Sequence, residues 1–287
     1  MPLAEKHIAE DNSTISEKLF VLKEFIGSFS RVAVSFSGGV DSTLLLVLCS
    51  RVLQGNVLAL TVTSPLQSRE DLKWAATISS TLGIRHKIVP VDILGDQKVA
   101  RNFPNRCYYC KRRLLAAIFD AAAEEGIDVV FDGTNADDTL DYRPGFKALE
   151  ELGVISPFVK FGITKKEIRQ LSKQLDLPTC NLPSNACLAS RISYYTPITG
   201  DLLDKIEKGE KFLRESGFIT VRLRVYNHLA CIEVGQPEIK SIFTEEKRNN
   251  ILNGIKKIGF HAVAVDLEGY ASGKLNRGIG ELHRDRS

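Results

Sequence analysis

The residues best suited to chemistry form a short glycine-containing run at 37–43, Ser-Gly-Gly-Val-Asp-Ser-Thr. The run follows an apolar, β-branched stretch at 31–36 and opens a helical pattern at 41–52. Such a turn directs backbone N–H groups and the positive end of the helix dipole outward, and its glycines let an anion approach the backbone closely. A carboxylate beside bound phosphates is suited to holding Mg²⁺. We therefore expect a phosphate site formed by Ser37, Gly38, Gly39, Asp41, Ser42 and Thr43.

Three other interpretations of this run are possible. A Walker A loop would end in Gly-Lys-Ser/Thr and a dinucleotide-binding loop would contain Gly-x-Gly-x-x-Gly, and the run has neither pattern. An ordinary glycine turn capped by serine and aspartate is the simplest alternative. The position of the run, after the first strand of a strand–helix alternation, argues against that alternative.

A second polar cluster follows the predicted strand at 128–132, where the chain reads Gly-Thr-Asn-Ala-Asp-Asp. Ligands of parallel sheets bind beyond the carboxyl ends of the strands. We therefore expect Gly133, Asn135 and Asp137 to face the same pocket as the run at 37–43. Helix capping is the alternative role for the aspartate.

Cysteine thiols offer a second kind of chemistry. Cys107 and Cys110 form a Cys-x-x-Cys pair, predicted to lie in a loop ahead of a basic helix. Cys187 lies in the motif Ala-Cys-Leu-Ala-Ser-Arg, with Cys180 nearby. The pair alone is compatible with two unlinked thiols, a redox pair, or half of a zinc or iron–sulfur site. The remaining two cysteines fall within predicted elements and are interpreted as core residues, Cys49 and Cys231.

The elements that must position these residues alternate between strand and helix over the first two-thirds of the chain. Thr164 and Glu167 form a capping box at the start of one predicted helix. The alternation predicts a doubly wound parallel sheet, hence an α/β fold. The predicted strands lie at 31–36, 56–63, 86–91 and 128–132, and the predicted helices at 16–29, 41–52, 68–82, 111–125 and 164–175.

The pattern changes after Thr199, and it predicts a smaller α+β domain. We therefore expect two domains, 1–195 and 196–287. The expected elements of the second are a helix at 201–216, strands at 220–226 and 229–234, a helix at 238–258 and a strand at 261–267. Within the first of these strands Arg222 and Arg224 share a face, because side chains alternate. Two guanidinium groups suit a phosphate or carboxylates, although solvated arginines on a half-buried strand are common.

Composition limits the class of protein. The 287 residues are 44% hydrophobic and 25% charged, which is typical of a folded domain. The net charge is only +3, from 38 basic and 35 acidic side chains, which argues against nucleic acid as the main partner. The N-terminal stretch has no signal-peptide pattern, and the apolar run at 44–49 is too short to span a bilayer. We expect a cytoplasmic protein with no membrane segment.

The run at 37–43 resembles the PP-loop of the ATP pyrophosphatase superfamily, an adenine nucleotide alpha hydrolase-like fold. Members of that superfamily cleave ATP between its α- and β-phosphates, adenylate an oxygen of the substrate, and hold the departing pyrophosphate in this loop. The resemblance implies ATP and Mg²⁺ as ligands, with Asp41 on the metal. Thr61 to Ser64, at the end of the second predicted strand, are then candidates to contact the adenosine, with Thr61 as the chosen residue. It also makes the segment 196–287 a candidate substrate-binding or oligomerisation domain.

Further motifs resemble the LarE family, which comprises ATP-dependent sulfurtransferases of nickel-pincer nucleotide biosynthesis. The motifs extend from Ser37 to Gly273 and include ACLASR, GTNADD with DYRPG, VRLRV, IEV and DLEGY. The resemblance implies a small nucleotide substrate, pyridinium-3,5-biscarboxylic acid mononucleotide, whose carboxylates become thiocarboxylates. It also implies a homo-oligomer, with a hexamer as one candidate. On the same ground Cys187, Arg222, Arg224 and Glu233 are candidate catalytic residues, and Ser190, Arg191 and Arg143 are candidates for substrate binding.

Two sulfur sources occur in the family that this chain resembles. In one class a single cysteine, here Cys187, gives up its own sulfur and becomes dehydroalanine. In the other, three cysteines hold a [4Fe–4S] cluster whose fourth iron carries an extra sulfide. Because the chain has both the pair and Cys187, we favour a cluster on Cys107, Cys110 and Cys187. A structural zinc that includes Cys180, or no metal at all, are the alternatives.

Three competing functions are also open. An ammonia-dependent amidotransferase or ligase would share the PP-loop but would not explain the cysteines. A tRNA thiolase would combine a PP-loop with cysteines but should carry a basic surface. A non-enzymatic nucleotide-binding module would be insensitive to Cys187→Ala.

Overall fold

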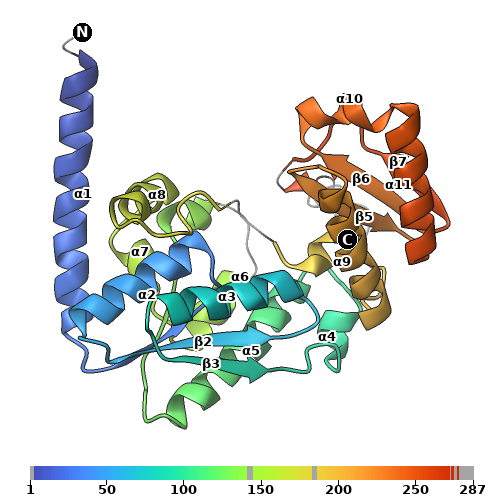
Figure 1. The fold of residues 1–287 in the computed structure, drawn as a ribbon. Coiled ribbons are helices and arrows are strands. Elements are labelled where there is room, and N and C mark those ends of the chain that lie inside the picture. The colour runs from blue at the N-terminus through green and yellow to red at the C-terminus, as the bar shows by residue number, and fades with distance from the viewer. Residues whose placement is uncertain (1–2, 141–144, 183–185, 272, 275–276, 278–287) are drawn as a thin grey trace, which may run out of the picture. The chain divides into compact units, whose positions relative to one another are not determined.

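The computed structural model describes residues 3–140, 145–182, 186–271, 273, 274 and 277, and its ribbon is drawn in Figure 1. The chain forms two compact units. The first comprises residues 1–91 and 107–185, and the second comprises 92–106 and 186–287. The predicted single boundary at residue 195 differs from this division, because the second unit begins at Ala186 and takes in an earlier segment of the chain.

The first unit is built around four parallel strands in the order β3-β2-β1-β4. This is the doubly wound sheet that the strand–helix alternation predicts. The strands are β1 (Val32–Ser35), β2 (Val57–Thr63), β3 (His86–Pro90) and β4 (Val130–Asp132). The helices of this unit are α1 (Leu3–Gly27), α2 (Val40–Val52), α3 (Arg69–Thr81), α5 (Arg106–Ala123), α6 (Gly145–Glu151), α7 (Pro157–Lys160) and α8 (Lys165–Gln174), with a 3₁₀ turn η1 (Ala136–Leu140).

Alternating side chains of the strands pack into two apolar cores, one on each face of the sheet. Val32 and Val34 of β1 pack with α2 and α3, whereas Ala33 packs on the opposite face with α5. The helices that cover each face can be followed in Figure 1. Because both faces are covered, β2 is buried almost along its whole length, as its continuous apolar character predicts.

The second unit holds a three-stranded sheet in the order β5-β6-β7. β5 (Val221–Tyr226) and β6 (Leu229–Val234) are antiparallel, and β7 (Ala262–Val265) runs parallel to β6. The other elements are α4 (Gln97–Ala100), η2 (Leu188–Arg191), α9 (Gly200–Glu215), η3 (Gln236–Glu238), α10 (Ile239–Ile242) and α11 (Glu245–Ile258). The predicted continuous helix at 238–258 is therefore wrong, because Thr244 adopts an extended conformation and starts α11 afresh.

The segment 92–106 joins the second unit through the side chain of Asn102, which is fully buried. Its amide nitrogen donates to the carbonyl oxygens of Ser193 at 2.9 Å and Thr196 at 3.0 Å. Its carbonyl oxygen accepts a hydrogen bond from Arg106. A short stretch of chain is thus tied to residues about ninety positions later, which a linear division of the sequence misses.

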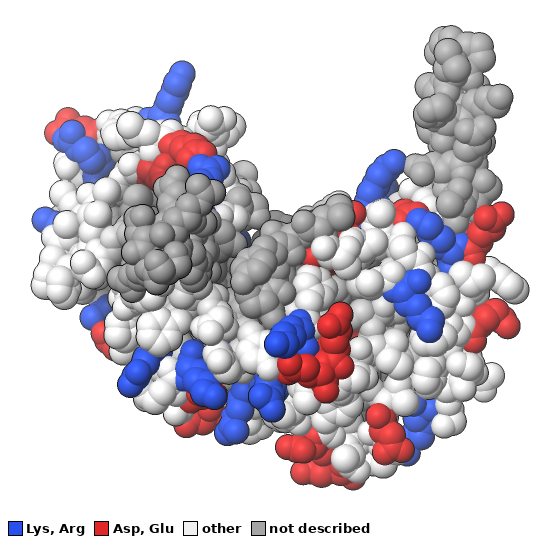
Figure 2. Space-filling view, turned by 180° about the vertical axis from the view of Figure 1, so that it is seen from behind, with Lys and Arg blue, Asp and Glu red and all other residues white. Residues whose placement is uncertain are grey.

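None of the described helices combines the length and the apolar character needed to cross a membrane. On the face shown in Figure 2, basic and acidic side chains are interspersed. This distribution is in keeping with the small net charge of the chain.

Candidate active site

The glycine-containing run forms the loop between β1 and α2. Gly39 is the N-cap residue of α2 and provides no side-chain capping bond, so the first turn keeps N–H groups available for an anion. Gly38 has a φ of +74°, and a Cβ there would lie 3.0 Å from the Cα of Ala75 in α3. The hydroxyls of Ser37 and Ser42 lie 3.1 Å apart and brace the loop from within. The loop therefore has the form of a phosphate cradle.

The chain after β4 lies against the first turn of α2, as the sequence predicts for neighbouring strand ends. A Cβ at Gly133 would stand 2.8 Å from the backbone nitrogen of Ser42, so only glycine fits there. Asn135 is buried, and its amide nitrogen donates to Asp41 Oδ1 at 3.3 Å. Its side-chain oxygen accepts from the backbone N–H of Asp137 at 3.0 Å. The two predicted clusters are thus brought together at one edge of the sheet.

Two lysines that the sequence analysis missed are paired with carboxylates at this edge. Lys165, the first residue of α8, forms an ion pair with Asp41, and its backbone N–H donates to Asp137 Oδ2 at 2.8 Å. Lys111 of α5 lies 3.3 Å from the buried carboxylate of Asp132. The position of Lys165, directly after the predicted N-cap Thr164, was the only available signal for its role.

Thr61 does not offer its hydroxyl to a ligand. Its side chain is 2% exposed, donates to the carbonyl oxygen of Phe36 at 2.6 Å, and lies 2.8 Å from His86 Nε2. Two nearby hydroxyl groups, by contrast, are buried and lack a hydrogen-bond partner among the described residues: Thr43 Oγ1 in α2 and Ser64 Oγ, just beyond β2. Ser64 is therefore better suited than Thr61 to contact a bound nucleotide.

The cysteine pair lies in a helix, and its predicted loop position is wrong. Cys107 and Cys110 occupy the first turn of α5, where residues three apart share one face. Cys107 is exposed and Cys110 is partly buried. Two thiols on one turn fit half of a zinc or iron–sulfur site. Cys187 is also exposed but belongs to the second unit, and no group of three metal-binding side chains forms within the described ranges.

The other cysteines are less accessible. Cys49 is fully buried, and burial raises the pKa of its thiol far above the usual range. Cys231 of β6 is partly buried, and burial raises the pKa of its thiol as well. Both thiols therefore remain protonated at neutral pH, as expected for core residues. Cys180 is partly buried within the first unit.

The loop that carries Cys187 is held by the guanidinium group of Arg191, which is only 1% exposed. Arg191 pairs with Glu210 of α9 through Nε at 2.8 Å and Nη2 at 3.2 Å. Its Nη1 donates to the carbonyl oxygens of Ala186 at 2.6 Å and Cys187 at 3.1 Å, and to Ser190 Oγ at 3.0 Å. The structure thus gives Arg191 a part in holding this loop, whereas its predicted contact with substrate stays a prediction.

The predicted arginine pair of β5 divides into two environments. Arg224 is buried, donates to Glu233 Oε1 at 3.1 Å, and holds the carbonyl oxygen of Ser190 at 2.5 Å. Arg222 lies over the ring of Tyr270 at 5.0 Å. Burial lowers the pKa of Arg222, and the positive charges of Arg191 and Arg224 lower it further. A group of neighbouring guanidinium groups of this kind suits an anionic group of a ligand.

Glu233 complements this cluster. It is 1% exposed, and its second oxygen, Oε2, has no hydrogen-bond partner in the part of the chain that the structure describes. A buried carboxylate oxygen without a partner is costly, and a polar ligand group would satisfy it. Arg143, the remaining predicted substrate residue, lies outside the described residues.

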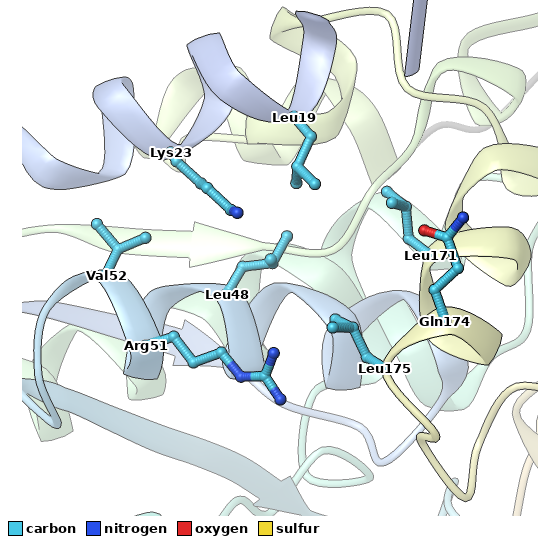
Figure 3. Close-up of a pocket in the computed structure, with 8 residues that line it drawn as sticks. All are labelled: Leu19, Lys23, Leu48, Arg51, Val52, Leu171, Gln174 and Leu175. Atoms are coloured by element: carbon cyan, nitrogen blue, oxygen red, sulfur yellow. The ribbon is translucent and has the colours of Figure 1, made fainter. Parts of the chain in front are cut away.

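Figure 3 shows a cavity of about 250 Å³ between α1, α2 and α8. It lies at the C-terminal end of α2, whereas the phosphate loop lies at the N-terminal end of that helix. The cavity is therefore separate from the candidate active site. It is lined by Leu19, Lys23, Leu48, Arg51, Val52, Leu171, Gln174 and Leu175.

Comparisons with known proteins agree with this geometry. The profile of the NAD synthase family matches residues 18–106, which include the phosphate loop. An uncharacterized protein of Synechocystis sp. is 37% identical over 92% of this chain and 98% of its own length. The pyridinium-3,5-bisthiocarboxylic acid mononucleotide synthase of Lactiplantibacillus plantarum is 34% identical over 92% of this chain and 95% of its own length. The chain belongs to the LarE family.

Membership of the LarE family accounts for both units, because the match to the Lactiplantibacillus synthase covers nearly the whole chain. The NH3-dependent NAD+ synthetase of Campylobacter jejuni is more distant, at 25% identity over 71% of this chain and 88% of its own length. This chain thus combines a phosphate-loop unit similar in sequence to NAD synthetases with a second unit that carries the arginine cluster.

Proposed function

We propose that this chain is an ATP-dependent sulfurtransferase that converts the carboxylates of pyridinium-3,5-biscarboxylic acid mononucleotide into thiocarboxylates. The observation that carries the proposal is its 34% identity, over 92% of the chain, to a synthase named for the bisthiocarboxylic product. The phosphate loop, with its uncapped helix start and its neighbouring Asp41, supports the use of ATP.

The proposed reaction has two steps. A substrate carboxylate oxygen attacks the α-phosphorus of ATP, forming an acyl adenylate and releasing pyrophosphate. A sulfur nucleophile then attacks the activated carbonyl carbon, and AMP leaves with the former carboxylate oxygen. The adenylation is needed because a carboxylate is a poor electrophile.

The residues of the first unit suit the first step. The N–H groups at the start of α2 and the hydroxyls of Ser37 and Ser42 would bind the departing pyrophosphate. Asp41 is the carboxylate suited to Mg²⁺, which when bound would neutralise charge on the phosphates. Lys165, now paired with Asp41, is placed to exchange that partner for a phosphate oxygen. Ser64 would contact the nucleoside through its buried hydroxyl.

The residues of the second unit suit the substrate and the second step. Arg222 and Arg224 would bind the anionic groups of the substrate, and Glu233 would accept a hydrogen bond from it. Arg191 holds the loop that presents Cys187. For the sulfur we propose a [4Fe–4S] cluster on Cys107, Cys110 and Cys187, which when bound would supply an iron able to carry sulfide. In the alternative, Cys187 donates its own sulfur.

Anaerobic purification tests the proposal directly. We expect the protein to hold iron and inorganic sulfide, and to release pyrophosphate from Mg-ATP only when the dicarboxylate nucleotide is added. Cys187→Ala should lose thiocarboxylate formation, whereas Cys180→Ser, the matched control, should retain it. A colourless protein that loses the mass of H₂S from Cys187 would contradict the cluster and identify Cys187 as the sulfur donor. Pyrophosphate release that requires ammonia would overturn the sulfurtransferase assignment itself.

A further inference from the structure

His86, the first residue of β3, is a half-buried titratable residue that the proposed mechanism does not use. Both of its ring nitrogens have hydroxyl partners. Nε2 lies 2.8 Å from Thr61 Oγ1 in β2, and Nδ1 lies 2.9 Å from Ser79 Oγ in α3. The ring also packs edge-on against that of Phe36, with centroids 5.7 Å apart. One side chain therefore joins two neighbouring strands and a helix.

The hydrogen positions in this group follow from counting protons. The Thr61 hydroxyl has a single proton, which it donates to the Phe36 carbonyl oxygen at 2.6 Å. Its oxygen can then only accept from His86, so Nε2 must carry a hydrogen. Burial lowers the pKa of His86, which favours the neutral ring at pH 7. The Ser79 hydroxyl lies within reach of two acceptors, Nδ1 of His86 at 2.9 Å and the Ala76 carbonyl oxygen at 3.0 Å, and with a neutral ring protonated at Nε2 its one proton goes to Nδ1. The neutral ring is thus the Nε2–H tautomer.

One end of this chain of hydrogen bonds lies next to the phosphate loop, and the other end lies in α3, the helix that the loop contacts. The Phe36 carbonyl belongs to the peptide group that leads into Ser37, the first residue of the loop. Ser79 lies one helical turn beyond Ala75, against which Gly38 of the loop is pressed. His86 thereby links the strand that enters the loop to the helix that supports it.

We infer that His86 is a positioning residue for the phosphate loop, acting through Thr61 on the peptide group that enters the loop and through Ser79 on α3. The inference rests on the proposed function, because it takes ATP as the ligand of that loop. It assigns Thr61 an indirect part in nucleotide binding in place of the predicted contact with adenosine.

Calorimetric titration of the full-length protein with Mg-ATP tests the inference. His86→Phe keeps the ring but removes both nitrogens, and we expect it to weaken ATP binding about fivefold, the effect of losing one well-placed hydrogen bond. His86→Gln retains a side-chain N–H able to reach Thr61, and should restore most of that loss. His261→Phe, at an exposed histidine of the second unit, is the matched control and should bind ATP as the parent does.

Two further measurements separate positioning from a general loss of structure. The ¹⁵N spectrum of the parent protein should identify Nε2 of His86 as the protonated nitrogen. In a double-mutant cycle, the effects of His86→Phe and Thr61→Val on ATP affinity should be less than additive, because both variants remove the hydrogen bond between these two side chains.

The outcomes are distinct. A folded His86→Phe variant that binds ATP as tightly as the parent, or a ring protonated at Nδ1 alone, would overturn the inference. A parent protein that binds no ATP would instead overturn the proposed function.

Discussion

Arg191 illustrates how the residues near Cys187 depend on one buried charge. Replacing it with methionine would leave the carboxylate of Glu210, 3% exposed, without its main partner. We expect Arg191→Met to lower the free energy of unfolding by about 3 kcal/mol, the low end for a broken buried pair, because the backbone N–H of Leu223 still donates to Glu210. Urea denaturation measures the loss.

The same variant should also release the loop that presents Cys187, since two carbonyl oxygens of that loop lose their donor. We therefore expect Cys187 to react faster with iodoacetamide in Arg191→Met than in the parent. Lys211→Met, at an exposed position of α9, the helix that carries Glu210, is the control. It should change neither the free energy of unfolding nor the reactivity of Cys187 by much. Unchanged stability would show that Glu210 does not depend on Arg191.

At the scale of the element, the start of α8 links local capping to the phosphate site. Thr164 caps the helix, and the next residue, Lys165, pairs with Asp41. We expect Thr164→Ala to lower the free energy of unfolding by about 1 kcal/mol, as is usual for loss of an N-cap, and also to weaken ATP binding because Lys165 loses its fixed position. Denaturation and calorimetric titration measure the two effects.

Thr199→Ala provides the matched control, because Thr199 caps α9 in the second unit through the same kind of bond, 3.2 Å from the N–H of Leu202. It should lose similar stability and retain the affinity for ATP. Equal losses of affinity in the two variants would mean that Thr164 acts only on global stability.

The elements also show what the sequence could and could not predict. The periodic strands and the capping box of Thr164 and Glu167 are local patterns, and the structure confirms both. The prediction of a loop around Cys107 was wrong because α5 begins at Arg106, five residues before the predicted helix start at 111. Lys165 was missed because its position after the N-cap Thr164 places it at a helix start but does not indicate that its partner is Asp41, 124 residues earlier in the chain. Tertiary contacts decide such cases, and one sequence does not display them.

At the scale of the whole molecule, the division of the chain decides which fragments can fold. The second unit needs residues on the N-terminal side of 195, because Glu210 pairs with Arg191 and a backbone bridge joins Ile192 to Val225 of β5. We expect a fragment 196–287 to show no cooperative urea transition, because the carboxylate of Glu210 would be buried without its cation. Circular dichroism during urea titration tests this.

A fragment 186–287 should regain a cooperative transition, since it restores both Arg191 and the Ser190 carbonyl that Arg224 holds. A peptide comprising residues 92–106 should raise the midpoint of that transition, because Asn102 then supplies its amide to Ser193 and Thr196. An Asn102→Ala peptide, which lacks the amide, should have no such effect. If 196–287 unfolds at the same urea concentration as 186–287, the buried pair of Arg191 and Glu210 is not what defines this unit.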